Sequence, residues 1–311
     1  MALQYLQAKL SLLPRVFSPL FDVIFSTLPF NQRMRLLLLQ PLNIIAALLC
    51  APQVLFTNRY SVIYIPTRNG RRRCLVFEPP RSASSKQIIL RPLHIDIHGG
   101  AWVGGLPEQS LRWCTLLSAS TGAVVVSITY SIAPRHVYPT AHDDADDIAA
   151  YLLAHAEDFG VDPRLLTIGG SSVGGNLALS VSQGFYRQGK DVPLAFVAWY
   201  PALCFRAAPW EKRKPEGFPK SDPLAVLLPL FDVYAGANRA EHLGDARLHP
   251  VLWGRETLPR DMLLVSAGVD VLLEEGVEFV EKMEGEGRVE MILVKKGFHG
   301  FMECKHLVMC R

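Results

Sequence analysis

The most constraining feature of this sequence is an almost unbroken apolar run at residues 123–129, Ala-Val-Val-Val-Ser-Ile-Thr. A strand with one face in water alternates apolar and polar residues, whereas a strand buried on both faces is apolar nearly throughout. Such a strand needs a layer of helices on each side of its sheet. The run therefore predicts the interior of an α/β sheet.

The rest of the chain alternates strand-like and helix-like segments, as a parallel sheet with crossover helices requires. We expect strands at residues 60–65, 74–77, 93–98, 123–129, 165–168, 194–199, 262–266 and 289–294, and helices at 106–120, 143–156, 173–188 and 274–284. Asn69-Gly70 predicts a hairpin turn between the first two strands. The pattern predicts a mostly parallel, twisted sheet with helices on both faces.

Two segments do not fit this alternation, residues 1–57 and about 202–245, and insertions of this length are typical of lids. The stretch 36–57 carries no charge and is long enough to suggest a transmembrane helix. Pro41 and Pro52 interrupt it, and its polar amides would need partners in lipid. We therefore predict two short amphipathic helices there, which cover a groove or touch a membrane surface.

Composition narrows the class of protein. Half of the residues are hydrophobic, which excludes a disordered chain, and 32 basic against 29 acidic residues exclude the charge balance of a nucleic-acid-binding protein. We expect the basic runs at 71–73 and 212–214 to be solvated loop surface. Six scattered cysteines without disulfide or zinc spacing predict free thiols, and no signal-peptide pattern is present, so we expect a cytoplasmic protein.

The strongest chemical signal is the segment 168–176, Ile-Gly-Gly-Ser-Ser-Val-Gly-Gly-Asn, where a strand turns sharply into a helix. A nucleophile elbow has this context and the pattern G-x-S-x-G. Ser172 satisfies the pattern, whereas centring it on Ser171 would require glycine in place of Val173. A glycine-rich phosphate loop is the alternative, but the Lys-Ser/Thr of a P-loop is missing. The segment therefore predicts that Ser172 is a nucleophile.

Two further segments supply the groups that such a serine needs. His98-Gly99-Gly100-Ala101-Trp102 follows a predicted strand and can aim backbone N–H groups at an oxyanion. Asp270 and His299 each lie just past the end of a later predicted strand. Strand ends of a parallel sheet meet at one edge, so the order Ser172, Asp270, His299 predicts a catalytic triad.

Together these residues resemble the hormone-sensitive-lipase-like branch of the α/β-hydrolase esterases. The resemblance covers about residues 60–302 and rests on His98-Gly99-Gly100, Tyr130–His136 with Tyr138-Pro139, Asp162-Pro163-Arg164, the elbow with Asn176, Asp270 and His299. It implies an α/β-hydrolase fold and a serine carboxylesterase without cofactor or metal. Ser172 would be the nucleophile, His299 the general base and acid, and Asp270 the residue that orients His299. The oxyanion donors would be N–H groups from Gly99, Gly100 or Ala101 together with Val173.

The resemblance also implies a domain organisation. Residues 1–57 would be N-terminal cap helices, and residues 58–311 a catalytic domain with a cap or lid insertion at about 202–245. Three residues depart from the family pattern: Ala101 replaces the third glycine of H-G-G-G, Ser171 replaces an acidic residue, and Val173 replaces a small alanine. None of these changes removes a catalytic group.

Some alternatives stay open. An aryl-formamidase of the kynurenine type has the H-G-G-x-W form and would use the same triad, and a non-catalytic ligand-binding homologue would share the fold. The compact chain with an aromatic-rich predicted lid is similar to fungal secondary-metabolite esterases of the versiconal hemiacetal acetate esterase type. This similarity implies an acetyl ester as substrate. The expected partner is a small-molecule ester, a homodimer stays open, and neither nucleic-acid binding nor membrane contact is expected.

Several other side chains have both a functional and a structural interpretation. His94, Asp96 and His98 alternate along one predicted strand, and we interpret them as a polar cluster rather than a metal site. We interpret His142 as part of a charge cluster at the start of a helix, together with its acidic neighbours. The aromatic residues that could line a substrate pocket are expected to be ordinary packing; they are Trp102, Trp210, Phe218 and Tyr234.

Overall fold

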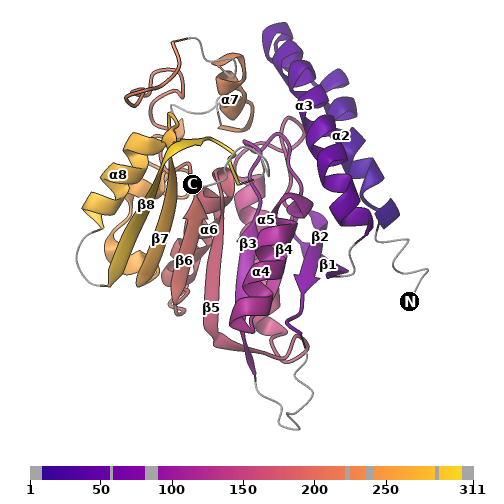
Figure 1. Cartoon of the computed structure of the whole chain (residues 1–311), viewed down its shortest axis with the longest axis vertical. Coiled ribbons are helices and arrows are strands. Elements are labelled where there is room, and N and C mark those ends of the chain that lie inside the picture. Colours follow the sequence, from indigo (N-terminus) through magenta and orange to yellow (C-terminus); the bar gives the residue numbers. More distant parts are fainter. Residues whose placement is uncertain are drawn as a thin grey trace.

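The computed structural model describes residues 9–56, 59–80, 90–220, 225–235, 241–283 and 287–302. Eight strands form one sheet in the order β1-β2-β4-β3-β5-β6-β7-β8 (Figure 1). The strands are β1 Ser61–Thr67, β2 Gly70–Phe77, β3 Arg91–Ile97, β4 Val124–Ile128, β5 Val161–Ser171, β6 Ala195–Trp199, β7 Asp261–Val269 and β8 Arg288–Phe298. β1, β2 and β4 pair antiparallel, and all other neighbours pair parallel. The predicted α/β fold with a mostly parallel sheet is confirmed.

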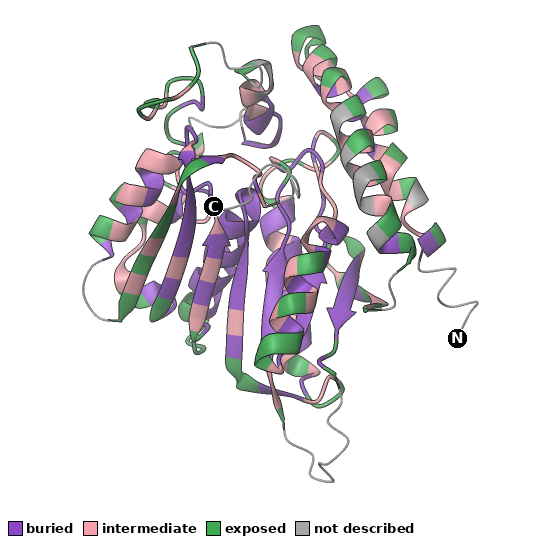
Figure 2. Cartoon of the chain, in the orientation of Figure 1, coloured by how far each residue is buried: buried purple, intermediate pink, exposed green. Residues whose placement is uncertain are grey.

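Helices cover both faces of this sheet (Figure 1). They are α2 Leu13–Ile24, α3 Phe30–Leu55, α4 Leu111–Thr121, α5 Thr140–Ala154, α6 Val173–Arg187, α7 Phe231–Ala235 and α8 Leu273–Lys282, with short 3₁₀ turns at Pro107–Ser110, Ala225–Leu230, Pro250–Leu252 and Arg255–Thr257. α5 and α6 pack side by side, α4 packs on β4, and α8 packs on β7 and β8. Every residue of β4 is buried, as the apolar run predicts, and Figure 2 shows this buried centre of the sheet.

The hairpin predicted at Asn69-Gly70 is also confirmed. β1 and β2 pair in register from Thr67 opposite Gly70 to Ser61 opposite Val76. Gly70 has a φ of 108°, a backbone conformation that glycine adopts without the penalty that a Cβ imposes. The turn therefore fixes the register of the antiparallel edge of the sheet.

The prediction of two short helices in the stretch 36–57 is wrong. α3 is a single helix of 26 residues that runs through Pro41 and Pro52. Both prolines lie on the exposed side of α3, where the local bend that a proline imposes does not disturb core packing. In the described part of the chain, no helix combines the length and the hydropathy needed to cross a bilayer.

The basic run at 71–73 is not the solvated loop that the sequence predicts. It lies within β2, and only Arg71 is exposed. Arg73 is fully buried and pairs with Glu108 at 2.7 Å, while Arg72 pairs with Asp144 at 2.8 Å. The two ion pairs tie the antiparallel edge of the sheet to the turn before α4 and to α5. Cys74, Cys114 and Cys204 are free thiols, and Cys304 and Cys310 lie outside the described residues.

Candidate active site

Three polar residues each follow the last residue of a strand directly. Ser172 comes after β5, Asp270 after β7 and His299 after β8. These strands are parallel to one another, so their carboxyl ends lie at one edge of the sheet, the upper edge in Figure 1. The loop after β3, which begins with His98, leaves the sheet at the same edge. The topology therefore brings together the residues that the sequence predicts as a site.

Ser172 occupies a strained turn between β5 and α6. Its φ is 53° and its ψ is −120°, a combination that residues other than glycine rarely adopt. Its N–H donates to the carbonyl of Trp199 at 2.9 Å, and its carbonyl accepts from the N–H of Ala202 at 3.1 Å. These two bonds to the end of β6 hold the serine in the turn, at the N-terminus of α6.

The two glycines of G-x-S-x-G let the turn pack tightly. A Cβ at Gly170 would lie 2.3 Å from the carbonyl oxygen of Ile97, and one at Gly174 would lie 2.0 Å from the same oxygen. Both distances are far below van der Waals contact. The pattern therefore exists because α6 and β5 approach the end of β3 too closely for any side chain.

The three predicted triad residues form a continuous hydrogen-bonded chain. His299 Nε2 lies 3.0 Å from Ser172 Oγ, and His299 Nδ1 lies 2.7 Å from Asp270 Oδ2. The other oxygen of Asp270 accepts the N–H of Leu272 at 3.0 Å, which fixes the carboxylate plane. Asp270 is 3% exposed and Ser172 4% exposed. This geometry allows a proton to move from the serine hydroxyl to an imidazole whose orientation the carboxylate holds.

The loop after β3 contains backbone N–H groups that are available for the role the sequence predicts. Within the described residues, the N–H groups of Gly99, Gly100 and Ala101 donate to no backbone carbonyl, and Val173 is the first residue of α6 and has no acceptor within the helix. Gly100 and Ala101 both have positive φ, 116° and 52°. The hydroxyl of Tyr130 is 3.1 Å from the carbonyls of both His98 and Gly99 and holds the loop from behind. Free N–H groups next to the serine are what an oxyanion needs.

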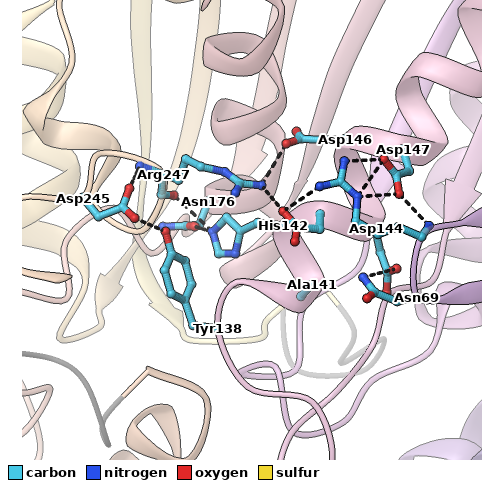
Figure 3. Close-up of polar contacts among 12 residues, drawn as sticks. Asn69, Tyr138, Ala141, His142, Asp144, Asp146, Asp147, Asn176, Asp245 and Arg247 are labelled. Atoms are coloured by element: carbon cyan, nitrogen blue, oxygen red, sulfur yellow. Dashed lines mark hydrogen bonds and ion pairs between the residues drawn. The ribbon is translucent and has the colours of Figure 1, made fainter. Parts of the chain in front are cut away.

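His142 is not part of a charge cluster, contrary to the sequence-based interpretation. It is 1% exposed on the buried side of α5, and burial together with Arg247 lowers its pKa to about 3, so the ring is neutral. Its Nδ1 lies 2.8 Å from the hydroxyl of Tyr234. Its Nε2 lies 3.1 Å from both Asn176 Oδ1 and the carbonyl of Arg247 (Figure 3). The carbonyl of Arg247 only accepts, which places the proton on Nε2 and makes Nδ1 the acceptor from Tyr234.

Asn176 links this histidine to the nucleophile helix. It lies one turn after Ser172 in α6, and its side-chain amide donates to the carbonyls of Ala202 and Leu248, both at 3.0 Å. Tyr234 comes from α7, within the insertion at 202–245, and its hydroxyl also accepts the N–H of Ala141 at 3.2 Å. The network therefore joins α5, α6 and the inserted segment behind the serine, and every polar atom named in it is satisfied.

A second part of this network lies at the surface of α5. Arg247 donates to Asp143 at 2.9 Å and to Asp146 at 2.8 Å, and Tyr138 donates to Asp245 at 2.5 Å (Figure 3). Burial raises the pKa of Asp146 to about 6, although Arg247 opposes this. These contacts fasten the end of the inserted segment to the start of α5.

The remaining candidates are the aromatic residues that could line a pocket and the polar residues of β3. Trp102 and Tyr234 are buried in the core, whereas Trp210 is 47% exposed, and none of the three stands among the hydrogen-bonding partners of Ser172. His94 pairs with Thr167, Asp96 accepts from Ser127, and both contacts are shorter than 3 Å. In the part of the chain that the structure describes, no three His, Cys, Asp or Glu side chains come together in the way a metal ion requires.

Comparison with curated proteins finds relatives that are named as ester hydrolases and lipases. An ethyl acetate hydrolase from Pseudomonas putida is 30% identical over 217 residues, which cover 68% of this chain and 66% of that protein. Human hormone-sensitive lipase is 28% identical over 174 residues, which cover 56% of this chain and 16% of the lipase. The chain thus spans just under two thirds of the length of the ethyl acetate hydrolase and a small part of the lipase.

Solved structures agree with these relatives. The thermostable carboxylesterase EstE1, cloned from a metagenomic library, is 28% identical with a TM-score of 0.72, covering 86% of this chain and 91% of that one. Carboxyl esterase 2 of the mycorrhizal fungus Tuber melanosporum is 25% identical with a TM-score of 0.68, covering 80% and 81%. The sequence profile of the alpha/beta hydrolase fold matches residues 94–303, more than half of the chain. The resemblance to the hormone-sensitive-lipase-like esterases, which the sequence motifs indicate, is confirmed. This protein belongs to the alpha/beta hydrolase fold family.

Proposed function

We propose that the chain is a serine carboxylesterase that hydrolyses a small or medium acyl ester through an acyl-enzyme. The observation that carries this proposal is the hydrogen-bonded chain from Ser172 through His299 to Asp270, beside N–H groups that have no backbone acceptor. Its relatives support the same reaction, because they include enzymes named as an ethyl acetate hydrolase and carboxylesterases.

The reaction follows from this geometry. Ser172 Oγ attacks the ester carbonyl as His299 Nε2 takes its proton, and Asp270 stabilises the resulting imidazolium. The negative charge that develops on the carbonyl oxygen is met by N–H groups of Val173 and of Gly99, Gly100 or Ala101. His299 returns the proton to the leaving alcohol, which leaves the acyl group on Ser172. A water molecule then repeats the attack with His299 as base and releases the acid.

We extend the proposal to an acetyl group. Two of the departures from the family pattern add atoms near the oxyanion donors: Ala101 adds a methyl group to the loop, and Val173 is a fully buried, branched residue next to the serine. Less room at this position favours a short acyl chain. The name of the Pseudomonas relative, an ethyl acetate hydrolase, supports the same class of ester. The similarity to fungal secondary-metabolite esterases extends this to acetates of bulky aromatic alcohols.

The test compares wild type with Ser172→Ala on p-nitrophenyl acetate, butyrate and decanoate. We expect kcat/KM of the variant to fall by about 10³-fold or more, since the loss of a triad nucleophile leaves only binding and oxyanion stabilisation. Ser171→Ala is the matched control, because it removes the neighbouring hydroxyl and leaves the triad intact. It should keep most of the activity. A fluorophosphonate probe should label wild type and Ser171→Ala but not Ser172→Ala.

Substrate comparison separates the alternatives. Faster turnover of benzyl acetate than of ethyl acetate, whose alcohols are similar leaving groups, would support an aromatic alcohol, and a decanoate preference would contradict the acetyl proposal. Turnover of N-formylkynurenine in preference to every ester would replace the esterase with the formamidase. Full activity in Ser172→Ala would overturn the proposed mechanism.

A further inference from the structure

Exposed apolar side chains gather on the two N-terminal helices. Among the residues that the structure describes, 24 large hydrophobic side chains are exposed, and half of them lie between residues 9 and 56. These twelve are Leu10, Phe17, Phe21, Ile24, Phe25, Phe30, Met34, Leu38, Ile45, Leu48, Leu55 and Phe56. Scattered exposed hydrophobic residues are normal on a folded protein, but such a concentration marks a contact surface.

The exposed residues form one stripe on each helix. On α3 they recur every three or four residues from Phe30 to Leu55, and the gaps in the series are filled by the exposed Pro41 and Pro52. At about 1.5 Å per residue, the 26 residues of α3 give a stripe of about 39 Å. On α2 the stripe comprises Phe17, Phe21 and Ile24, and the exposed Leu10 and Phe25 lie before and directly after this helix. Apart from Asn31 at the first turn of α3, the described exposed positions of the two helices are apolar.

Polar side chains of the same segment point inward. Lys9 is 9% exposed and donates to the hydroxyl of Tyr60 at 3.0 Å. Gln40 is 3% exposed and donates to the carbonyl of Leu36 at 2.9 Å. Arg15 is half-buried in the space between the helices α2 and α3 and the loop at Gly104. A helix at a water-facing surface has the opposite polarity, so the exposed face of α2 and α3 is suited to an apolar neighbour.

The charge of this region is one-sided. Of the five basic residues in the first 59, Lys9 and Arg15 are turned toward the body of the protein, which leaves Arg33, Arg35 and Arg59 with a single acidic residue, Asp22. Arg33 and Arg35 lie in the first turns of α3, and Arg33 donates to the carbonyl of Ile24 at 2.7 Å across the turn between the helices. Positive charge is thus held near the turn that joins α2 and α3. Anionic lipid head groups attract basic residues at this position.

α2 and α3 form a helical hairpin that packs on the body of the molecule through α3, which contacts the 3₁₀ turns at Ala225–Leu230 and Pro107–Ser110. The tip of this helical hairpin rises above the carboxyl ends of the strands, on the side of the sheet where the triad lies, and its outer surface is largely exposed (Figures 1 and 2). An apolar face of this kind on a pair of helices is suited to lie in the plane of a membrane interface.

We propose that the outer face of α2 and α3 docks onto the surface of an anionic lipid bilayer. This outer face consists of the twelve exposed residues named above, and the proposal is independent of the proposed function. A second copy of the chain is a poorer occupant, because two such faces packed with their helices parallel would bring the Arg33 and Arg35 pairs of like charge together. The exposed proline rings of Pro41 and Pro52 also interrupt the side-chain ridges that interdigitate between helices. Neither feature hinders insertion among lipid head groups.

The test is flotation of the full chain with unilamellar vesicles of phosphatidylcholine alone or with about 30% phosphatidylserine. The phosphatidylserine gives the second set of vesicles a negative surface potential. Wild type should bind both and bind the anionic vesicles more tightly. The variant Phe21→Ser/Phe25→Ser/Leu38→Ser/Leu48→Ser should lose about tenfold or more in the partition coefficient on both, because four inserted side chains are removed. Arg33→Gln/Arg35→Gln should lose about fivefold per arginine, and on the anionic vesicles only.

A matched control carries four serines at exposed apolar positions on other elements, Leu116→Ser/Tyr186→Ser/Leu194→Ser/Ile292→Ser, and should bind like wild type. Circular dichroism and thermal unfolding of every variant show that it is folded. Light scattering after size exclusion measures the oligomeric state in parallel. Absence of vesicle binding by folded wild type, or equal losses in both four-serine variants, would overturn the proposal. So would a dimer that dissociates only in the α2 and α3 variant while vesicles bind neither protein, since the face would then join two copies of the chain.

Discussion

The indole ring of Trp102 stacks on the phenol ring of Tyr234, with centroids 4.6 Å apart and planes 23° apart. Trp102 follows Ala101 in the loop after β3, and Tyr234 belongs to α7 in the inserted segment. Trp102 is fully buried and has a φ of 59°. The conformation of the loop that presents the predicted oxyanion donors therefore depends on a residue of the insertion, more than 130 positions further along the chain.

Substitution of Tyr234 can therefore separate two contributions of its side chain, the hydrogen bonds of the hydroxyl and the stack of the ring on Trp102. Tyr234→Phe keeps the stacked ring but leaves His142 Nδ1 and the N–H of Ala141 without a partner. We expect a loss of about 1–3 kcal/mol in the free energy of unfolding, since buried polar groups become unsatisfied, with little change in kcat. Urea denaturation and ester hydrolysis measure the two quantities.

Tyr234→Leu also removes the stack on Trp102, so kcat should fall about tenfold or more while KM changes little, because the loop supports the transition state. Equal kcat in the Phe and Leu variants would show that the stack does not position the loop. His142→Leu, which cannot hydrogen-bond, should resemble Tyr234→Phe in its effect on stability.

A second prediction concerns Asp270. Asp270→Asn keeps the shape of the side chain and can still accept the N–H of Leu272, but it presents an amide to His299 Nδ1. The imidazole then carries its proton on Nε2 and cannot accept from Ser172, so kcat should fall by about 10⁴-fold with KM nearly unchanged. Steady-state kinetics on p-nitrophenyl acetate measure this loss. A fall of less than about tenfold would contradict the proposed role of Asp270.

A third prediction concerns backbone strain at Ala101. Its φ of 52° lies in the left-handed region, which costs a residue with a Cβ about 1–2 kcal/mol. Ala101→Gly should therefore raise the free energy of unfolding by about 0.5–1 kcal/mol, after the greater entropy of glycine in the unfolded chain is subtracted. Urea denaturation gives the difference. Ala145→Gly within α5 is the control and should lower it, and a loss of stability in both variants would refute the strain argument.

A fourth prediction concerns acid stability. Burial lowers the pKa of His142 to about 3 and those of His94, His98 and His249 to about 4. Between about pH 6.5 and pH 4 the unfolded chain binds protons that the folded protein does not, so stability falls as the pH falls. Each of these histidines contributes at most about 1.4 kcal/mol per pH unit, and Asp146, whose pKa is raised to about 6, offsets about one of them.

The check is the slope of unfolding free energy against pH from urea denaturation between pH 7 and pH 5. Because glutamine does not titrate, His142→Gln should reduce this slope by the contribution of about one proton, which is at most about 1.4 kcal/mol per pH unit. An unchanged slope would mean that His142 is already protonated in the folded protein. A structural loss alone would lower the stability without changing the slope.

Local patterns predict the strand ends and the site at those ends. Ser172, Asp270 and His299 stand where the sequence places them because each lies four or five residues after the end of a predicted strand, and parallel strands align their carboxyl ends without any further information. The tight turn at Gly70 is equally local, because its φ of 108° is set within the hairpin. For these elements the sequence neighbours of a residue decide its structure.

Other features depend on partners that are remote in sequence. His142 lies in an acidic stretch, and only its contact with Tyr234, 92 positions away, gives it a buried neutral role. Arg73 looks like surface until Glu108 is placed opposite it. α3 continues through Pro41 because that side of the helix is exposed, which the sequence of the helix does not reveal. The cap and catalytic domain boundaries at residues 57 and 58 stay a prediction.

Because Ser172, Asp270 and His299 each follow a strand directly, no loop of independent flexibility lies between the sheet and the reacting atoms. Most of the segment 202–245 can change in length or sequence without moving these three residues relative to one another, provided that Ala202 keeps its hydrogen bond to the Ser172 carbonyl and Tyr234 keeps its stack on Trp102. Evolution of a new substrate preference on this chain therefore requires no change in its chemical machinery. Among descendants of this protein, sequence divergence should accumulate in the insertion while the strand ends stay constant.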